Sequence, residues 1–235
     1  MPEPIAEQVL EDVSPVLGDA VVIWGRWAIP GWLDDSNIRL INHCMRHLPT
    51  EDPIIEIGSF CGVSTVVMAR IKQLAAIPNK IISSDPWRFE GADFTTTVGD
   101  SQITFTAYRE HVKRLFLSAT GTFAPGEPPL HFEEYSDSFF DKWAGGLREI
   151  DSHNRSFQLG GPIAMAYIDG DHTYEQSRQD FINCDRFLVP GGFIVFDDSA
   201  DGTDWGSHRA AVEVLERSDY KLVAKGPNYC FQKVG

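Results

Sequence analysis

Two acidic clusters follow two apolar segments of the chain, and their residue types are those that bind metal ions. Asp169-Gly170-Asp171-His172 comes directly after residues 163–168, and Asp197-Asp198 comes directly after residues 193–196. Each apolar segment is typical of a parallel strand buried on both faces. Ligands of open α/β sheets bind outside the carboxyl ends of the strands, so the clusters lie at a ligand site if the two strands are neighbours. Because so many carboxylates together are costly without a cation, the pattern predicts a hard divalent ion such as Mg²⁺.

The elements that must position these clusters alternate between strand and helix. After an N-terminal arm with an aromatic stretch at residues 24–32, Asp34 or Asp35 is expected to cap a helix that ends at His47. Further strands are predicted at residues 53–57, 80–84 and 130–132, and helices at 63–74, 105–116 and 174–188. A turn signal at residues 225–228 between two short apolar runs predicts a final antiparallel hairpin. This alternation predicts an α/β fold with a doubly wound, mostly parallel sheet.

Length and charge exclude several classes of protein. A chain of 235 residues with 43% hydrophobic content is expected to form a single domain over residues 1–235, with an N-terminal arm and helix (1–50) and an insertion at 87–129 that is a candidate lid. The formal net charge of −14 argues against nucleic acid as a partner. The lack of a long apolar run and the acidic, proline-containing start predict a cytoplasmic protein without a membrane partner.

The segment from Glu56 to Gly62 joins the first of these strands to its helix and has the composition of a ligand loop. A dinucleotide fingerprint needs a glycine in the middle of the loop, where the backbone approaches a pyrophosphate, and Phe60 occupies that place. The bulky side chain disfavours NAD and FAD and favours S-adenosylmethionine, which carries no phosphate. The alternative is a tight strand-to-helix turn that binds nothing.

Several residues near this loop are expected to contact such a cofactor. Amides from Gly62 onward could receive its carboxylate, with added hydroxyls from Ser64 and Thr65. Asp85, at the end of the next strand, could accept both ribose hydroxyls. The full set of predicted cofactor-binding residues is Glu56, Gly58, Ser59, Gly62, Ser64, Thr65, Asp85, Ser136 and Asp169.

At four places the chain resembles a class I S-adenosylmethionine-dependent methyltransferase, and more narrowly the metal-dependent sugar O-methyltransferases of macrolide and aminocoumarin biosynthesis. The resemblance lies in residues 56–65, 85–87, 167–174 and 188–198, above all in Asp-Gly-Asp-His-Thr-Tyr combined with Pro-Gly-Gly-x-x-x-x-Asp-Asp. It implies a Rossmann-like seven-stranded sheet with a reversed last strand, and it makes the strands before the two acidic clusters adjacent. It also implies Mg²⁺ ligation by Asp169, Asp197 and Asp198. In related enzymes the region after strand three holds the adenine edge, which points to Ser136.

The resemblance implies a general base at Asp171 or His172, and the residue pattern does not separate the two. His172 ranks ahead because its ordinary pKa near 6.5 suits proton transfer at neutral pH. Each residue also has a purely structural alternative, since Asp171 could cap the next helix, Asp197 and Asp198 could cap a turn, and His172 could bond a backbone carbonyl.

The predicted reaction is Mg²⁺-assisted methylation of a hydroxyl on a sugar or another polyhydroxylated small molecule. The competing hypotheses are a metal-independent enzyme that methylates nitrogen or a phenol, and a catalytically silent S-adenosylmethionine-binding protein. A homo-oligomer is compatible with the sequence.

Overall fold

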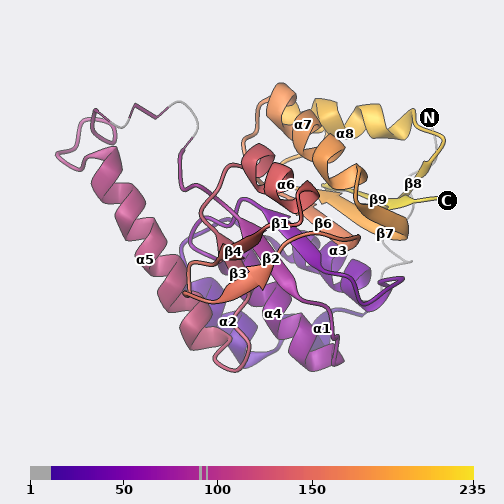
Figure 1. Cartoon of the computed structure of the whole chain (residues 1–235), viewed down its shortest axis with the longest axis horizontal. Helices are drawn as coiled ribbons and strands as arrows, with labels where there is room; N and C mark the ends of the chain where they lie inside the picture. The colour runs from indigo at the N-terminus through magenta and orange to yellow at the C-terminus, as the bar shows by residue number, and fades with distance from the viewer. Residues whose placement is uncertain (1–11, 90–91, 94) are drawn as a thin grey trace.

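The central sheet contains seven strands, and all but one of them run in the same direction (Figure 1). The computed structural model describes residues 12–89, 92–93 and 95–235. Its strand order is β3-β2-β1-β6-β7-β9-β8, with β9 antiparallel to both neighbours. The strands are β1 (Ile54–Ile57), β2 (Ile81–Ser84), β3 (Leu130–Phe132), β6 (Ile163–Ile168), β7 (Leu188–Phe196), β8 (Tyr220–Lys225) and β9 (Tyr229–Lys233). The predicted seven-stranded, mostly parallel α/β fold is confirmed, and so is the pairing of β6 with β7.

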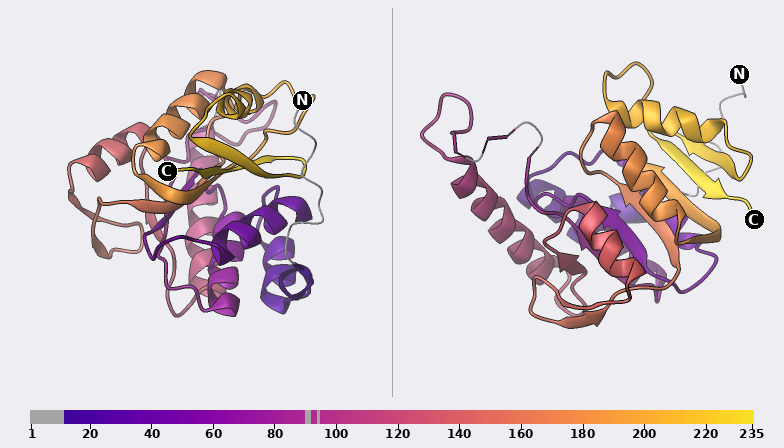
Figure 2. Two further views of the ribbon diagram at one scale, coloured as in Figure 1. Left: turned by 90° about the vertical axis from the view of Figure 1, so that its right-hand side faces the viewer. Right: turned by 45° about the horizontal axis from the view of Figure 1, so that its top comes forward.

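Helices cover both faces of the sheet, which explains the continuous apolar runs of its central strands. Figure 2 shows the N-terminal helices on one face and the C-terminal helices on the other. Successive strand residues point to opposite faces, so Met165 and Tyr167 pack into one core and Ala166 and Ile168 into the other. The helices are α1 (Ser14–Leu17), α2 (Ala20–Ala28), α3 (Asp35–Arg46), α4 (Val63–Ala75), α5 (Phe105–Phe123), α6 (Ser136–Ala144), α7 (Tyr174–Asp185) and α8 (Gly206–Leu215).

Several boundaries differ from the sequence prediction. The predicted cap of α3 is Asp34, whose carboxylate accepts from the Asn37 amide at 2.8 Å. The helix predicted at 174–188 ends at Asp185, and the Pro-Gly-Gly segment at residues 190–192 lies inside β7, whose pairing with β6 contains a register shift. Helices α1, α2 and α6 were not predicted, nor was the short hairpin β4 (Arg148–Ile150) and β5 (Ser156–Gln158). These elements are too short for their apolar periodicity to be distinctive.

The predicted insertion contains α5, which is longer than expected and packs against α4 and α2. Val112 and Phe116 are buried in that contact. Arg109 and Lys113 both form ion pairs with Glu133, which follows β3, and so they fasten the helix to the end of the sheet. Residues 1–11 of the predicted arm and residues 90, 91 and 94 of the insertion lie outside the described residues. A lid function for the insertion therefore stays a prediction.

Within the described part of the chain, none of the helices has the length and apolar character that crossing a bilayer would require.

Candidate active site

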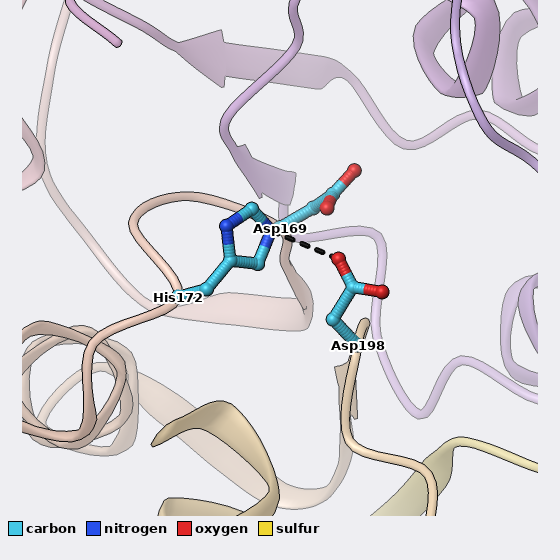
Figure 3. A group of neighbouring side chains, drawn as sticks. All are labelled: Asp169, His172 and Asp198. Atoms are coloured by element: carbon cyan, nitrogen blue, oxygen red, sulfur yellow. Dashed lines mark ion pairs between the residues drawn. The ribbon is translucent and has the colours of Figure 1, made fainter. Parts of the chain in front are cut away.

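Three side chains from the two predicted acidic clusters converge at the carboxyl edge of the sheet (Figure 3). Asp169 follows β6, Asp198 follows the adjacent β7, and His172 lies in the loop after Asp169. One ligand atom from each of the three lies within 4.8 Å of the others, and Nε2 of His172 is 2.9 Å from Oδ2 of Asp198. The parallel register that pairs Ile168 with Phe196 brings these residues together from distant parts of the sequence.

The charge at this edge favours a cation. Burial raises the pKa of the Asp169 carboxyl well above its usual range, and the nearby carboxylates of Asp197 and Asp198 raise it further. A divalent ion beside Asp169 would oppose this shift because it stabilises the ionised carboxylate. The carboxylates of Asp169 and Asp198 are the oxygen ligands that Mg²⁺ and related ions prefer, so these two residues fit the predicted metal.

The start of α8 holds the cluster in place. The Trp205 ring lies against the His172 ring with centroids 4.8 Å apart, and the Gly206 amide donates to the His172 carbonyl at 2.8 Å. The Ser207 hydroxyl donates to the Asp198 carbonyl at 3.0 Å. Asp198 itself adopts a left-handed backbone conformation with φ of 48°, a strained geometry that clusters at functional sites.

Asp197 faces a different environment from its neighbour in the sequence. Its Oδ1 atom accepts from the side-chain amides of Asn37 at 2.7 Å and Asn228 at 2.6 Å, and Oδ2 accepts from the Tyr167 hydroxyl. Asp197 is buried, and its Oδ1 also accepts from the Asp198 amide at 2.8 Å. The arrangement therefore departs from the expected set of three aspartates, because His172 rather than Asp197 lies beside Asp169 and Asp198. Ligation by Asp197 stays a prediction against which this geometry argues.

The loop after β1 lies directly beside the cluster. Gly58 has φ of 79°, and a Cβ atom there would lie 1.9 Å from the Asp169 carbonyl oxygen. Gly62 has φ of 93°, and a Cβ atom would lie 2.9 Å from the Phe116 ring. Both glycines are required by close approach as well as by backbone conformation. The strand order reverses between β1 and β6, and this is where open α/β sheets bind their ligands.

The comparisons with known proteins agree with this architecture. A family model described as "Methyltransferase domain" matches residues 55–199, which is more than half of the chain. The chain belongs to this methyltransferase family. The fold and the family together confirm the predicted class I S-adenosylmethionine-dependent methyltransferase.

Solved structures with the same fold include several O-methyltransferases. An O-methyltransferase from Bacillus cereus in complex with SAH has a TM-score of 0.59 and 14% identity, with 95% of each chain covered. TomG from Streptomyces achromogenes, solved with SAM, has a TM-score of 0.53 and 14% identity over 97% of this chain and 92% of its own. The O-methyltransferase NovP has a TM-score of 0.52 and 15% identity over 85% and 81%. No protein of curated function matched the sequence.

Asp85 of the methyltransferase lies at the end of β2, as predicted, and contacts the loop directly. Its Oδ2 atom accepts from the Ser59 and Phe60 amides, both at 2.8 Å, and Oδ1 accepts from the Trp87 amide at 2.6 Å. Burial raises the pKa of the Asp85 carboxyl, although these amides oppose the shift. Asp85 is thus close enough to the loop to bind a diol held there, and it also braces the loop.

The predicted roles of Glu56, Ser64 and Thr65 need correction. Glu56 is fully buried, and it accepts from the hydroxyls of Ser64 and Thr65 at 2.6 Å and from that of Ser83 at 2.5 Å. The expected donation from Ser64 and Thr65 to a cofactor carboxylate is therefore not what the methyltransferase shows. These groups form an internal network beneath the loop, because a buried carboxylate requires hydrogen-bond donors.

Two further predicted residues occupy mainly structural positions. Ser136 is the first residue of α6 and donates to the buried Asp180 at 2.5 Å, so its adenine contact stays a prediction. Asp171 is exposed and accepts from the Thr173 amide at 2.8 Å, while Thr173 caps α7. The structural alternative for Asp171 is therefore realised in part.

Asn37, Trp205 and Asn228 also position the site of the methyltransferase, and none of them was among the predicted site residues. Trp205 could have been noticed from the Trp-Gly pair before an apolar helix, whereas an isolated asparagine carries no comparable signal.

Proposed function

We propose that this methyltransferase transfers a methyl group from S-adenosylmethionine to a hydroxyl of a sugar or another polyhydroxylated small molecule, with assistance from Mg²⁺. The observation that carries the proposal is the convergence of Asp169, His172 and Asp198 beside the β1–α4 loop. The solved structures with this fold that are themselves O-methyltransferases support the choice of oxygen as acceptor.

The cofactor supplies an electrophilic methyl group, and the metal supplies positive charge that lowers the pKa of a neighbouring hydroxyl. The loop from Gly58 to Gly62 would position the methyl donor. The carboxylate of Asp85 would accept hydrogen bonds from the ribose hydroxyls of this cofactor. Asp169 and Asp198 would hold the ion. Since a direct displacement needs an in-line nucleophile, the rigid loop and the two strand ends determine much of the rate by orientation.

His172 accepts the proton of the acceptor hydroxyl in this proposal. Its ring is fixed by Trp205 on one side and by Asp198 at Nε2, whereas Asp171 is occupied at the start of α7. A base must lie within hydrogen-bond reach of the proton that it abstracts, and His172 lies beside Asp169 and Asp198, the residues that would hold the ion.

The experiment is a coupled assay that measures S-adenosylhomocysteine release from the purified protein with a panel of hydroxylated acceptors. We expect turnover that is lost after treatment with EDTA and restored by Mg²⁺ or Mn²⁺. Binding of S-adenosylmethionine without turnover on any acceptor would instead support the silent binding protein.

The His172–Asp198 pair also favours a second candidate, a metal-independent methyltransferase. A carboxylate that bonds one imidazole nitrogen can orient the ring as a base without any ion. Full activity in EDTA, combined with loss of activity in both His172→Ala and Asp198→Asn, would establish this candidate.

A further inference from the structure

A groove of about 400 Å³ is lined in part by Asp198, which also belongs to the cluster with Asp169 and His172. One wall comes from α2, α3 and the segment between them, with Arg26, Trp32 and Asp34. The opposite wall comes from the loop after β7 and the β8–β9 turn, and includes Ala200 and Asn228. Because Asp198 belongs both to this lining and to the reactive cluster, a molecule in the groove can present a hydroxyl at the cluster.

Trp32 has the exposure expected of a binding platform. Its side chain is 89% exposed, yet its ring stacks against Phe60 with centroids 6.0 Å apart and an interplanar angle of 25°. Phe60 in turn contacts Phe89 edge to face. A large exposed aromatic ring that is held by packing offers apolar contact area to the ring of a ligand at little entropic cost.

The charges of the groove select against anions. Its lining contains three aspartates, Asp34, Asp197 and Asp198, and a single arginine, Arg26, whose guanidinium already bonds Asp35 at 2.6 Å. A divalent ion at Asp169 and Asp198 would cancel their two charges, but Asp34 and Asp197 would still outnumber Arg26. A phosphate or carboxylate in this groove would be repelled by the aspartates, and the one arginine of the lining is already paired with Asp35.

The side-chain amides of Asn37 and Asn228 and the hydroxyl of Thr203, which also line the groove, donate to groups of the protein. The Asn37 amide donates to Asp197, and the Asn228 amide donates to both Asp197 and Asn37. The Thr203 hydroxyl donates to the Ala200 carbonyl at 2.9 Å. The wall is therefore preorganised, and it presents acceptor atoms more than donor atoms to a ligand.

We propose that this groove binds the methyl acceptor, that Trp32 is its ring-stacking platform, and that the acceptor is a neutral or cationic ring-bearing polyol such as a glycoside or an amino sugar. The inference rests on the proposed function and adds the charge class of the substrate. It also places the reaction after any step that removes phosphate from the acceptor, such as glycosyl transfer from an activated sugar.

The test uses sets of acceptors that share one sugar ring: a neutral methyl glycoside, the matching amino glycoside and the matching sugar phosphate. We expect turnover of the first two and weak or no turnover of the phosphate. Trp32→Ala should raise KM for the neutral glycoside about ten-fold and leave kcat within about two-fold, because the platform binds ground state and transition state alike. Trp32→Phe should recover most of the affinity.

Trp27→Ala is the matched control, since Trp27 is 86% exposed on α2 and does not line the groove. Its KM should equal that of the wild type. Ala200→Lys adds a cation to the groove and should lower KM for the sugar phosphate about ten-fold.

Three results would overturn the inference while leaving the methyltransferase activity intact. They are a preference for the sugar phosphate, an unchanged KM in Trp32→Ala, and a loss of S-adenosylmethionine affinity in Trp32→Ala that accounts for the whole effect through Phe60. Absence of methyl transfer to every acceptor, with the cofactor bound, would count against the proposed function itself and against the inference with it.

Discussion

The side-chain amide of Asn37 donates to Oδ1 of Asp197 at 2.7 Å, although the two residues are 160 positions apart. Through this bond α3 is fixed to the end of β7, next to the residue that carries the reactive carboxylate. Although Asp197 and Asp198 are neighbours in the sequence, the carboxylate of Asp197 bonds to asparagine side chains, whereas that of Asp198 lies in the cluster with Asp169 and His172.

Replacement of Asp197 by alanine should destabilise the protein. The amides of Asn37 and Asn228 and the hydroxyl of Tyr167 would remain buried without their acceptor, at an expected cost of ~2–4 kcal/mol. Urea denaturation measures this cost, with the exposed Asp204→Ala as control. If Asp197→Ala kept its stability but lost Mn²⁺ affinity as fully as Asp198→Ala, Asp197 would be a metal ligand after all.

His172 and Asp198 should behave as one unit in catalysis. His172→Ala is expected to lower kcat by roughly 10²–10⁴-fold, because it removes the base. If Asp198 acts through His172, the kcat of the double variant His172→Ala/Asp198→Asn should be hardly lower than the kcat of His172→Ala alone. Steady-state kinetics with calorimetric measurement of S-adenosylmethionine affinity checks this expectation. Strictly multiplicative losses would show that the two residues act independently.

The stability of the fold should fall between pH 4.5 and pH 7 because of Glu56. Burial raises the pKa of the Glu56 carboxyl from 4.5 to about 7, although the surrounding hydroxyls oppose the shift. In this window the folded protein keeps the proton and the unfolded chain releases it, so rising pH favours unfolding, by on the order of 3 kcal/mol in total. Glu56→Gln should flatten this part of the stability profile, as measured by urea denaturation at pH 5 and pH 8. An equal slope in the variant and the wild type would rule out Glu56 as its source.

Two glycines with similar backbone conformations should respond differently to alanine. Gly58 and Gly161 have φ of 79° and 93°, but a Cβ atom at Gly58 would meet the Asp169 carbonyl oxygen at 1.9 Å, whereas nothing lies within 4 Å at Gly161. Gly161→Ala should therefore cost about 1 kcal/mol of backbone strain, and Gly58→Ala should cost ~3 kcal/mol or more. Thermal unfolding of the two variants compares them directly. Similar shifts in Tm would show that close packing at Gly58 is unimportant.

The sheet and the edge at which the site lies could be predicted from the amino-acid sequence. Strands β1, β6 and β7 are buried on both faces, so they form continuous apolar runs, and the carboxyl ends of parallel strands meet at one edge. Together with the family resemblance, which implied that β6 and β7 are neighbours, this pattern predicted that Asp169, His172 and Asp198 lie close together and that Asp85 lies at the same edge as the glycine loop. The glycines could also be recognised, since the loop between a strand and a helix needs backbone conformations that other residues resist.

The directions in which individual polar side chains point could not be predicted from the sequence and are seen only in the folded chain. Asp197 accepts hydrogen bonds from Asn37 and Asn228. Ser64 and Thr65 donate to Glu56. Buried polar groups form hydrogen bonds with whichever elements pack around them. Those partners come from distant parts of the chain and leave no periodic trace in the sequence. For the same reason the groove beside Trp32 and its excess of carboxylates emerge only when α2, α3 and the β8–β9 turn pack against the end of β7.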